Sequence, residues 1–278
     1  MNVKATVLSE NSVLPGMGTV GEHGLSLLVE RGDKRILFDT GQGMALPHNA
    51  KIMGIDLSGL DAIVLSHGHY DHTGGLEWVL GQTGPVPVYI APGLFDPKFI
   101  ITMTGDERAI GIPYSRQDLE KAGAKFVTAD KPTEVAEGIT VTGPVPRESA
   151  DEYVEPILMV RNESGELVPD SVPDDMSLVL DTDRGTVLLT GCAHAGLINT
   201  IEHAKRIAKT DRLTAIIGGT HLVFATDDRV QATVDALIKT DVEMLAPAHC
   251  TGFRALGMLQ AKIADKLLPC SVGSEFTF

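Results

Sequence analysis

Apolar and polar positions along the chain predict many short strands and a smaller number of helices. Short apolar runs bounded by Gly, Pro, Asp or Asn predict strands. These strands lie at Val3–Leu8, Leu25–Glu30, Arg35–Asp39, Asp61–Ser66, Pro87–Ile90, Ile157–Val160, Ser177–Asp181, Thr186–Leu189, Leu213–Ile217 and Glu243–Ala246. Apolar residues at helical spacing predict helices at Asn49–Met53, Thr73–Leu80, Arg116–Ala122, Ala195–Lys209, Asp227–Lys239 and Arg254–Lys266.

The order of these elements predicts the fold class. Each half of the chain begins with strands and continues with alternating strands and helices, which favours two mixed sheets packed face to face with helices outside. We therefore expect an α/β fold and a single domain over residues 1–278. Residues 93–155 are rich in Gly and Pro and are expected to form an elaboration over one edge of the core.

The charge balance argues against two classes of partner. Lys plus Arg total 23 against 37 for Asp plus Glu, so the formal net charge is −14. Nucleic acid and anionic membranes both require clustered basic charge, so we expect neither as a partner. A small anionic substrate stays compatible, because a few local donors or a metal can hold it. The oligomeric state is left open.

Cysteine usage and hydrophobicity bear on the compartment. Cys192, Cys250 and Cys270 are widely spread, unlike the disulfide framework of a small secreted protein. The first ten residues lack the apolar core of a signal peptide, and no run reaches the ~18 apolar residues of a membrane helix. We therefore expect a cytoplasmic protein.

The densest chemical signal is a segment with three histidines and one aspartate within six residues. It lies between a predicted buried strand and a predicted helix and reads Ser66-His67-Gly68-His69-Tyr70-Asp71-His72-Thr73-Gly74-Gly75. Imidazole and carboxylate are the usual ligands of zinc, iron and manganese. In an extended segment His67 and His69 point the same way, while Asp71 and His72 can turn toward a second ion. The segment therefore predicts a transition-metal site rather than a surface histidine cluster.

The motif His67-x-His69-x-Asp71-His72, with Phe38-Asp39-Thr40-Gly41 upstream, resembles the metallo-β-lactamase superfamily. The resemblance covers most of the chain. It implies an αββα sandwich of two mixed β-sheets with outer helices. It also implies one or two divalent metal ions at the sheet edge, zinc first, with manganese, iron or magnesium as alternatives.

The further ligands implied by this resemblance depart from the usual pattern. His249, after the strand Glu243–Ala246, matches the family's final histidine. Cys192 follows Thr190-Gly191, where the superfamily has a bridging aspartate, and Asp174 stands where it has a histidine. The expected metal ligands are therefore His67, His69, Asp71, His72, Asp174, Cys192 and His249. Whether Asp174, Asp175, Cys192 or His194 completes the site is left open.

Other segments resemble one branch of the superfamily, which includes the 7,8-dihydropterin-6-methyl-4-(β-D-ribofuranosyl)aminobenzene-5′-phosphate synthases. These segments are His23–Ser26, Asp174-Asp175, Gly191–Gly196, Gly218–Leu222 and His249–Gly252. The resemblance implies a metal-dependent enzyme acting on a phosphorylated, pterin-like small molecule by group transfer or hydrolysis. Two alternatives stay open. One is a metal-dependent hydrolase of an ester, lactone or phosphodiester, and the other is a non-catalytic metal- or ligand-binding sensor.

Three histidines outside the motif lie close to glycine at the predicted ends of strands or helices. His23, His194 and His221 are expected at the rim of the sheets, where loops carry functional residues. We expect all three to handle the substrate, and His194 and His221 to act with Asp71 in catalysis. A capping or packing role is the alternative for each histidine.

An anionic group of the substrate is expected beside the metals. The N-terminus of the predicted helix Ala195–Lys209 would offer free backbone amides to it, close to His194 and His221. The loose segment Leu94–Arg116 is either a lid for a planar anionic ligand or an ordinary packed loop. Its aromatic and basic residues are Phe95, Lys98, Phe99, Arg108, Tyr114 and Arg116.

Overall fold

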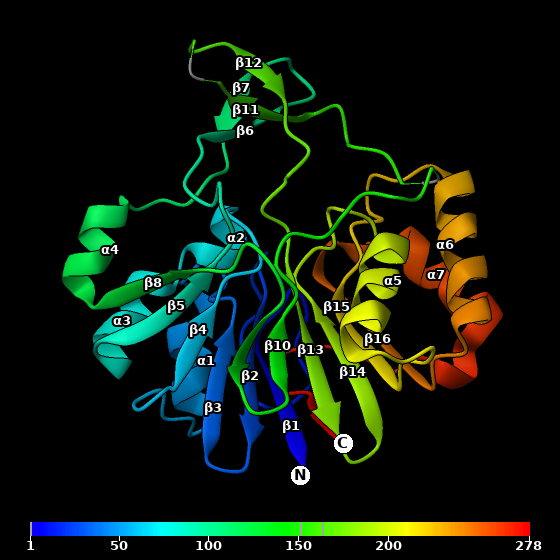
Figure 1. Ribbon diagram of the computed structural model, residues 1–278, viewed down its shortest axis with the longest axis horizontal. Helices are drawn as coiled ribbons and strands as arrows, with labels where there is room; N and C mark the ends of the chain where they lie inside the picture. Colours follow the sequence, from blue (N-terminus) through cyan, green and yellow to red (C-terminus); the bar gives the residue numbers. More distant parts are fainter. Residues whose placement is uncertain (1, 151, 163) are drawn as a thin grey trace.

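The computed structural model describes residues 2–150, 152–162 and 164–278. Within these residues, two mixed β-sheets pack face to face, and helices cover the outer face of each sheet (Figure 1). The predicted α/β class and its αββα sandwich are therefore confirmed.

The first sheet has the strand order β17-β1-β2-β3-β4-β5-β8. Its strands are β1 (Val3–Ser9), β2 (Ser26–Arg31), β3 (Lys34–Phe38), β4 (Ala62–Val64), β5 (Val86–Ile90), β8 (Ala124–Thr128) and β17 (Glu275–Thr277). Neighbouring strands are antiparallel from β17 to β3 and parallel from β3 to β8. The carboxyl ends of the parallel strands therefore share one edge, where ligand sites of such sheets commonly form.

The second sheet has the strand order β16-β15-β14-β13-β10-β9. Its strands are β9 (Thr133–Ala136), β10 (Ile139–Val141), β13 (Ser177–Thr182), β14 (Gly185–Thr190), β15 (Ala215–Gly219) and β16 (Met244–Ala248). Strands β14, β15 and β16 are parallel neighbours, and the remaining pairs are antiparallel. The loops that follow β14, β15 and β16 therefore leave the sheet at a common edge.

Alternation along the strands builds the layers. In β2, Leu27 and Val29 face the other sheet, whereas Leu28 faces the outer helices, and all three are buried. A strand that is covered on both faces has a continuous run of apolar residues, which explains why such strands could be predicted from the sequence.

Helices cover both outer faces. The first sheet is covered by α1 (Ala45–Ile52), α3 (Leu76–Thr83) and α4 (Arg116–Ala122), and the second by α5 (Leu197–Ala208), α6 (Asp227–Thr240) and α7 (Phe253–Ile263). The single-turn helix α2 (Tyr70–Thr73) lies at the sheet edge. No described helix combines the length and the apolar character that crossing a membrane requires.

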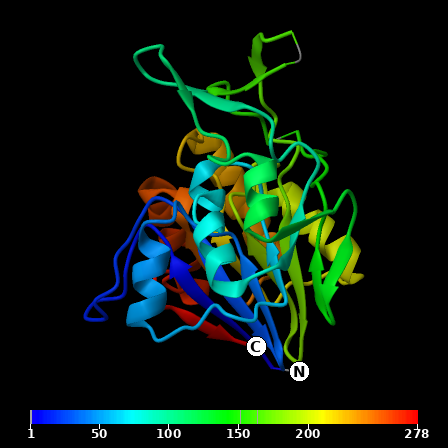
Figure 2. The same cartoon turned by 90° about the vertical axis from the view of Figure 1, so that its left-hand side faces the viewer.

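The elaboration expected at 93–155 is divided among the sheets. Strands β6 (Lys98–Ile101), β7 (Glu107–Ala109), β11 (Leu158–Arg161) and β12 (Leu167–Pro169) form a small antiparallel sheet in the order β12-β11-β6-β7. This sheet, called the upper sheet here, projects from one edge of the sandwich (Figure 2). Strands β8, β9 and β10 instead extend the two main sheets. The upper sheet therefore combines β6 and β7, from within residues 93–155, with β11 and β12, which follow that range.

Candidate metal centre

The candidate ligands come from strand ends that meet beneath the upper sheet. The histidine-rich loop follows β4 and continues into α2, so the whole motif lies at the carboxyl end of a parallel strand. Cys192, His221 and His249 lie within two residues of the ends of β14, β15 and β16. The topology of both sheets thus carries all of these side chains to one edge.

The first group of ligand atoms contains three imidazoles. Nε2 of His67 lies 2.9 Å from Nδ1 of His69 and 3.2 Å from Nε2 of His194. All three side chains are buried. Ligand atoms of His67, Cys192 and His194 lie within 4.8 Å of one another, a spacing that can hold one metal ion.

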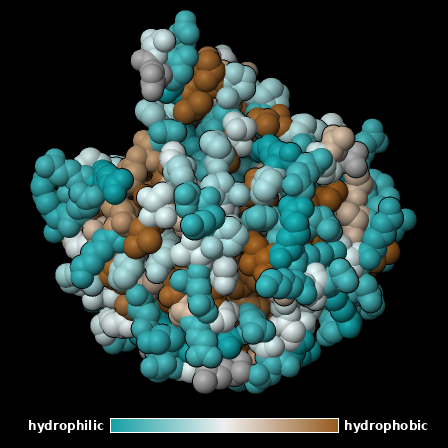
Figure 3. All heavy atoms as spheres, in the orientation of Figure 1, coloured by the Kyte–Doolittle hydropathy of each residue, from teal (hydrophilic) through white to brown (hydrophobic). Residues whose placement is uncertain are grey.

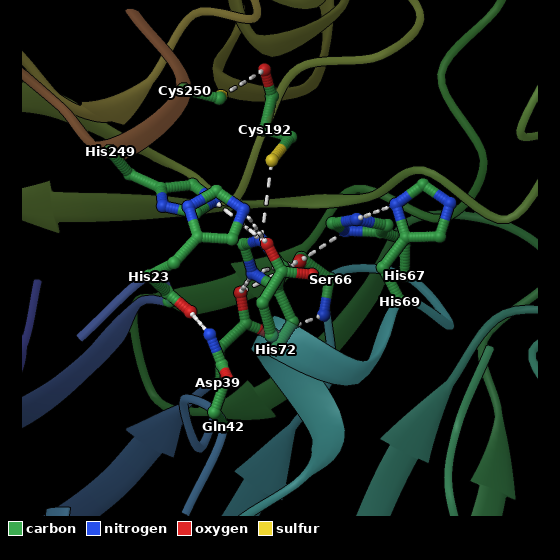
Figure 4. Close-up of polar contacts among 12 residues, drawn as sticks. His23, Asp39, Gln42, Ser66, His67, His69, His72, Cys192, His249 and Cys250 are labelled. Carbon is green, nitrogen blue, oxygen red and sulfur yellow. Dashed lines mark hydrogen bonds and ion pairs between the residues drawn. The ribbon is translucent and has the colours of Figure 1, made fainter. Parts of the chain in front are cut away.

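The second group lies on the other side of Cys192 (Figure 4). Nε2 of His249 is 3.2 Å from Nε2 of His72 and 3.3 Å from Oδ2 of Asp71. Sγ of Cys192 is 3.2 Å from Nε2 of His72. Ligand atoms of His72, Cys192 and His249 also lie within 4.8 Å of one another, so Cys192 belongs to both groups. Cys192 also forms a third group of this spacing with His221 and Cys250.

Buried hydrogen bonds orient the imidazoles. Nδ1 of His72 donates to Oδ2 of Asp39 over 2.7 Å, and the same carboxylate accepts from the Ser66 hydroxyl. Because that hydroxyl proton is used, Nδ1 of His67 donates to Oγ of Ser66 over 2.9 Å. Nδ1 of His249 donates to Oδ1 of Asn11 over 2.9 Å. These partners assign the tautomers and leave Nε2 without a proton in all three rings.

This tautomer pattern tests whether the site fits a cation. Nε2 of His72 and Nε2 of His249 face each other at 3.2 Å, and in the neutral rings neither carries a proton. Burial lowers the pKa of His72, but the Asp39 and Asp71 carboxylates outweigh it and raise that pKa, so a proton competes with a cation for this ring. Two lone pairs at this distance repel unless a cation accepts both. Two nitrogens bound to one tetrahedral zinc at about 2.0–2.1 Å would lie about 3.3 Å apart. The donor set and its spacing therefore fit divalent metal ions.

The protonation equilibria also suit metal binding. Burial, opposed by the Asp71 carboxylate, lowers the pKa of His69 to about 3. Burial and the neighbouring imidazoles hold the pKa of His67 and of His194 well below the usual range. Neutral imidazole is the form that ligates metals, so these side chains are prepared for that role at neutral pH.

Asp174 does not join the cluster, in contrast to the expectation from the sequence. Its Oδ1 lies 2.7 Å from Nζ of Lys98, and its Oδ2 accepts from the backbone amide of Gly68 over 2.7 Å. Both oxygens are therefore engaged at a buried ion pair behind the histidine loop. Asp175 is also turned to the backbone, since its Oδ2 accepts from the amide of Ala195. The expectation that Asp174 stands in for the superfamily's middle histidine as a ligand is therefore corrected. His194 lies beside His67 instead, with the two Nε2 atoms 3.2 Å apart.

The rim histidines differ in their surroundings. His221 is buried, its ring lies 4.0 Å from that of His194, and its Nε2 is 3.6 Å from Oε2 of Glu155. Neither ring nitrogen of His221 has a hydrogen-bond partner among the described residues. His23 is half exposed, and its Nε2 is 3.1 Å from Oδ2 of Asp71. The structure thus brings all three histidines to the cluster, from different sides.

The helix that was expected to bind an anion is already capped. The carboxylate of Glu152 accepts from the amides of Ile198 and Asn199 in the first turn of α5. A side-chain anion therefore occupies the position that a substrate phosphate would need. The expectation of an anion site at this helix N-terminus is wrong, because residue 152 is brought to it from a distant part of the chain.

A cleft of about 440 Å³ opens onto the cluster. Tyr70, Ile110, Leu158 and Phe224 form apolar parts of its wall, and Arg108 also lines it. This volume is in the range of small-molecule sites.

Several residues that shape the site had been given no role from the sequence. Asn11 and Glu10 directly follow β1, and Glu10 accepts from the backbone amide of His249 over 2.7 Å. The rule that functional side chains follow strand ends could have found this pair. Glu155 and Phe224 lie in irregular segments, and no local pattern indicates them.

Comparison with known proteins agrees with the fold and the donor set. Residues 19–249 match the family model described as the metallo-beta-lactamase superfamily. The chain therefore belongs to the metallo-β-lactamase superfamily.

Individual relatives match over most or all of the chain. The 7,8-dihydropterin-6-methyl-4-(β-D-ribofuranosyl)-aminobenzene-5′-phosphate synthase of Methanocaldococcus jannaschii is 30% identical, with 100% of this chain and 97% of that protein covered. The uncharacterised protein MJ0448 of the same organism is 36% identical over 86% of this chain and 87% of its own. The crystal structure of Tm1679, described as a metal-dependent hydrolase of the β-lactamase superfamily, is 30% identical, with a TM-score of 0.83, and the match covers 99% of this chain and 98% of that one.

Proposed function

We propose that this protein is a metal-dependent enzyme that transfers a group to or from a phosphorylated, pterin-like small molecule. The observation that carries the proposal is the position of Cys192, whose Sγ lies between two sets of buried ligand atoms at the floor of an open cleft. The full-length match to the Methanocaldococcus jannaschii synthase supports the substrate class.

The residues divide into two ligand sets. His67, His69 and His194 would hold one divalent ion, and Asp71, His72 and His249 a second, with Cys192 shared between them. Ions held there supply a Lewis acid that polarises an oxygen of the substrate or of its leaving group.

The remaining polar side chains move protons and orient groups. His221 faces Glu155 through Nε2, so its Nδ1 is the atom left to accept a proton from the substrate. Glu155 is itself held by Arg229 at 2.5 Å, which fixes the carboxylate beside His221. His23, half exposed beside Asp71, contacts the substrate at the opposite rim.

The test uses a joining reaction that would form the compound in the relative's name, with diphosphate chosen as the leaving group. Zinc-loaded protein is incubated with 4-(β-D-ribofuranosyl)aminobenzene 5′-phosphate and a 7,8-dihydropterin that carries diphosphate on its 6-methyl carbon. The amine nitrogen forms a bond to that carbon, the carbon–oxygen bond to diphosphate breaks, and the amine loses a proton. Mass spectrometry should detect the joined product and free diphosphate. The variant Cys270→Ala, at a residue outside every candidate ligand group of the described chain, should be as active as the wild type.

A second candidate function is hydrolysis of an ester, lactone or phosphodiester. The description of Tm1679 as a metal-dependent hydrolase, at a TM-score of 0.83, favours it. A panel of these substrates is run beside the joining assay. Hydrolysis without joining would replace the first proposal by this one. Full metal loading without turnover of any substrate would contradict both and favour a ligand-binding sensor.

A further inference from the structure

The upper sheet supplies one wall of the cleft and most of its apolar character. Ile100 of β6 and Leu158 of β11 line the cleft together with Ile110, which follows β7. Tyr70 and Phe224 contribute aromatic rings from the sandwich side. Apolar side chains also gather on the upper sheet and near its junction with the sandwich (Figure 3). Such a wall suits a planar or apolar part of a ligand.

Backbone hydrogen bonds fasten this wall to the metal loop. The amide of Tyr70 donates to the carbonyl of Ile110 over 2.9 Å, and His69 pairs with Gly111 in an isolated antiparallel bridge. Lys98 of β6 ties the same sheet to Asp174 through a buried ion pair. Arg108 is two residues from the bonded Ile110, so its position relative to the histidines is set by the backbone.

Arg108 is the only arginine or lysine among the described residues that line the cleft. No hydrogen bond or ion pair joins its guanidinium to another described residue. Its recorded side-chain contact is with the ring of Tyr70, whose centroid lies 6.0 Å from Cζ. Arg161 in the same sheet is different, because it pairs with Glu107 at 2.7 Å and lies over Phe99. Arg108 is exposed to solvent and therefore presents a free cation at the mouth of the cleft.

We propose that Arg108 binds a phosphate group of the substrate that takes no part in the reaction, while the apolar wall contacts the substrate's aromatic body. The proposal rests on the proposed function and deepens it, since it places the reacting carbon or oxygen at the histidine cluster and the phosphate at the far end. A guanidinium can bind phosphate through two parallel hydrogen bonds, and the guanidinium of Arg108 lies over the Tyr70 ring, 6.0 Å from its centroid. The capped N-terminus of α5 cannot offer a competing anchor.

The substrate class follows from this division of the cleft. It is an aromatic compound that carries a terminal phosphate monoester, separated from the reacting group by the length of the aromatic body. A phosphodiester whose phosphorus is attacked at the metals would instead place its phosphate at the cluster. Arg108 is needed to bind the phosphate in the first arrangement and not in the second.

The test measures binding rather than turnover, with phenyl β-D-ribofuranoside 5-phosphate and the unphosphorylated phenyl riboside as probes. Calorimetry on zinc-loaded protein should give a Kd for the phosphate that is lower by about 10- to 100-fold, the range of a hydrogen-bonded charge pair. Arg108→Met should abolish this preference, and Arg108→Lys should retain part of it because the charge stays but the fork is lost. Arg161→Met is the matched control and should retain the full preference.

The outcomes separate this proposal from the one on which it rests. The Arg108 site is overturned if Arg108→Met keeps the full preference for the phosphate. It is also overturned if Arg108→Met and the control Arg161→Met both lose that preference. An Arg108-dependent preference in a protein that fails the joining assay would keep the site and contradict the proposed reaction. Near-ultraviolet circular dichroism of each variant checks that the fold is retained.

Discussion

Sγ of Cys192 and Nε2 of His72 lie 3.2 Å apart at the centre of the candidate site, where two sets of buried ligand atoms meet. A thiolate in this position can contact an ion on either side. Thiolate also selects zinc and other soft or borderline metals over magnesium. The substitution of a thiol for the usual carboxylate is therefore compatible with a two-ion site and narrows the choice of metal.

His194 and His221 should differ in their effect on metal content, although the two histidines look alike in the sequence. His194 lies 3.2 Å from His67 through the two Nε2 atoms, so His194→Ala should lose metal. His221 faces Glu155 instead, so His221→Ala should retain its metal and lose turnover. Elemental analysis of both purified variants, beside the wild type, checks this difference. Equal metal content in the two variants would contradict the assignment.

Asp39 should control metal affinity without touching the ion. Its carboxylate accepts from Nδ1 of His72 and from Ser66, so Asp39→Asn disturbs the ring's tautomer and orientation. Loss of such a supporting partner typically weakens metal binding by about 10- to 100-fold. Competition with a chromophoric chelator measures the change. Asp61→Asn, at a surface ion pair with Lys34, should have no effect on metal affinity.

Lys98 should be needed for stability. It lies buried between Asp170 and Asp174, and Lys98→Met would leave two buried carboxylates without a cation. Breaking a buried pair in this way costs about 3–5 kcal/mol of the free energy of unfolding. Denaturant unfolding gives the value, with Lys34→Met as the control, for which a much smaller loss is expected because the ion pair of Lys34 is at the surface. If Lys98→Met lost less free energy of unfolding than the control, the ion pairs of Lys98 would not stabilise the attachment of the upper sheet.

Asp175 should make the stability of the metal-free protein depend on pH. Burial raises its pKa to about 7, against the lowering effect of the Ala195 and His194 amides. A folded-state pKa above the unfolded value of 3.8 means that the carboxyl group favours folding at low pH. This contribution is lost as pH rises from about 4 to about 7.

The isosteric variant Asp175→Asn isolates that effect, since it cannot ionise. As pH rises from 4 to 8, the free energy of unfolding of the wild type should fall relative to that of the variant. Chelator-treated samples unfolded in urea across this range provide the measurement. A constant difference would mean that Asp175 does not titrate in this window.

The central strands of the main sheets could be predicted from the sequence because they are covered on both faces. The apolar runs that include Leu27 and Leu189 are continuous for that reason, and β2 and β14 lie close to their predicted ranges. No strand was predicted at β6 to β10, β12 or β17, which are short and mostly carry partly or fully exposed residues. Their pairing is set by contacts between distant segments.

The same distinction applies to the site. The histidine loop is local, so its residues and spacing could be read directly. Asp174 was assigned wrongly because its partner, Lys98, comes from another sheet and neutralises it. The capping of α5 by Glu152 and the position of Arg108 in the cleft also depend on long-range placement. Residue type indicated their chemistry, but only the folded chain shows which groups they meet.

The central claim is that Cys192 is a thiolate ligand shared by the two metal positions. The most direct measurement is the near-ultraviolet absorption of the cobalt-substituted protein, since a thiolate bound to cobalt gives an intense charge-transfer band. Cys270→Ser serves as the matched control, because its thiol is also buried and free but belongs to none of the candidate ligand groups among the described residues. The band should be present in the wild type and in Cys270→Ser and absent in Cys192→Ser. An unchanged band in Cys192→Ser would contradict the claim.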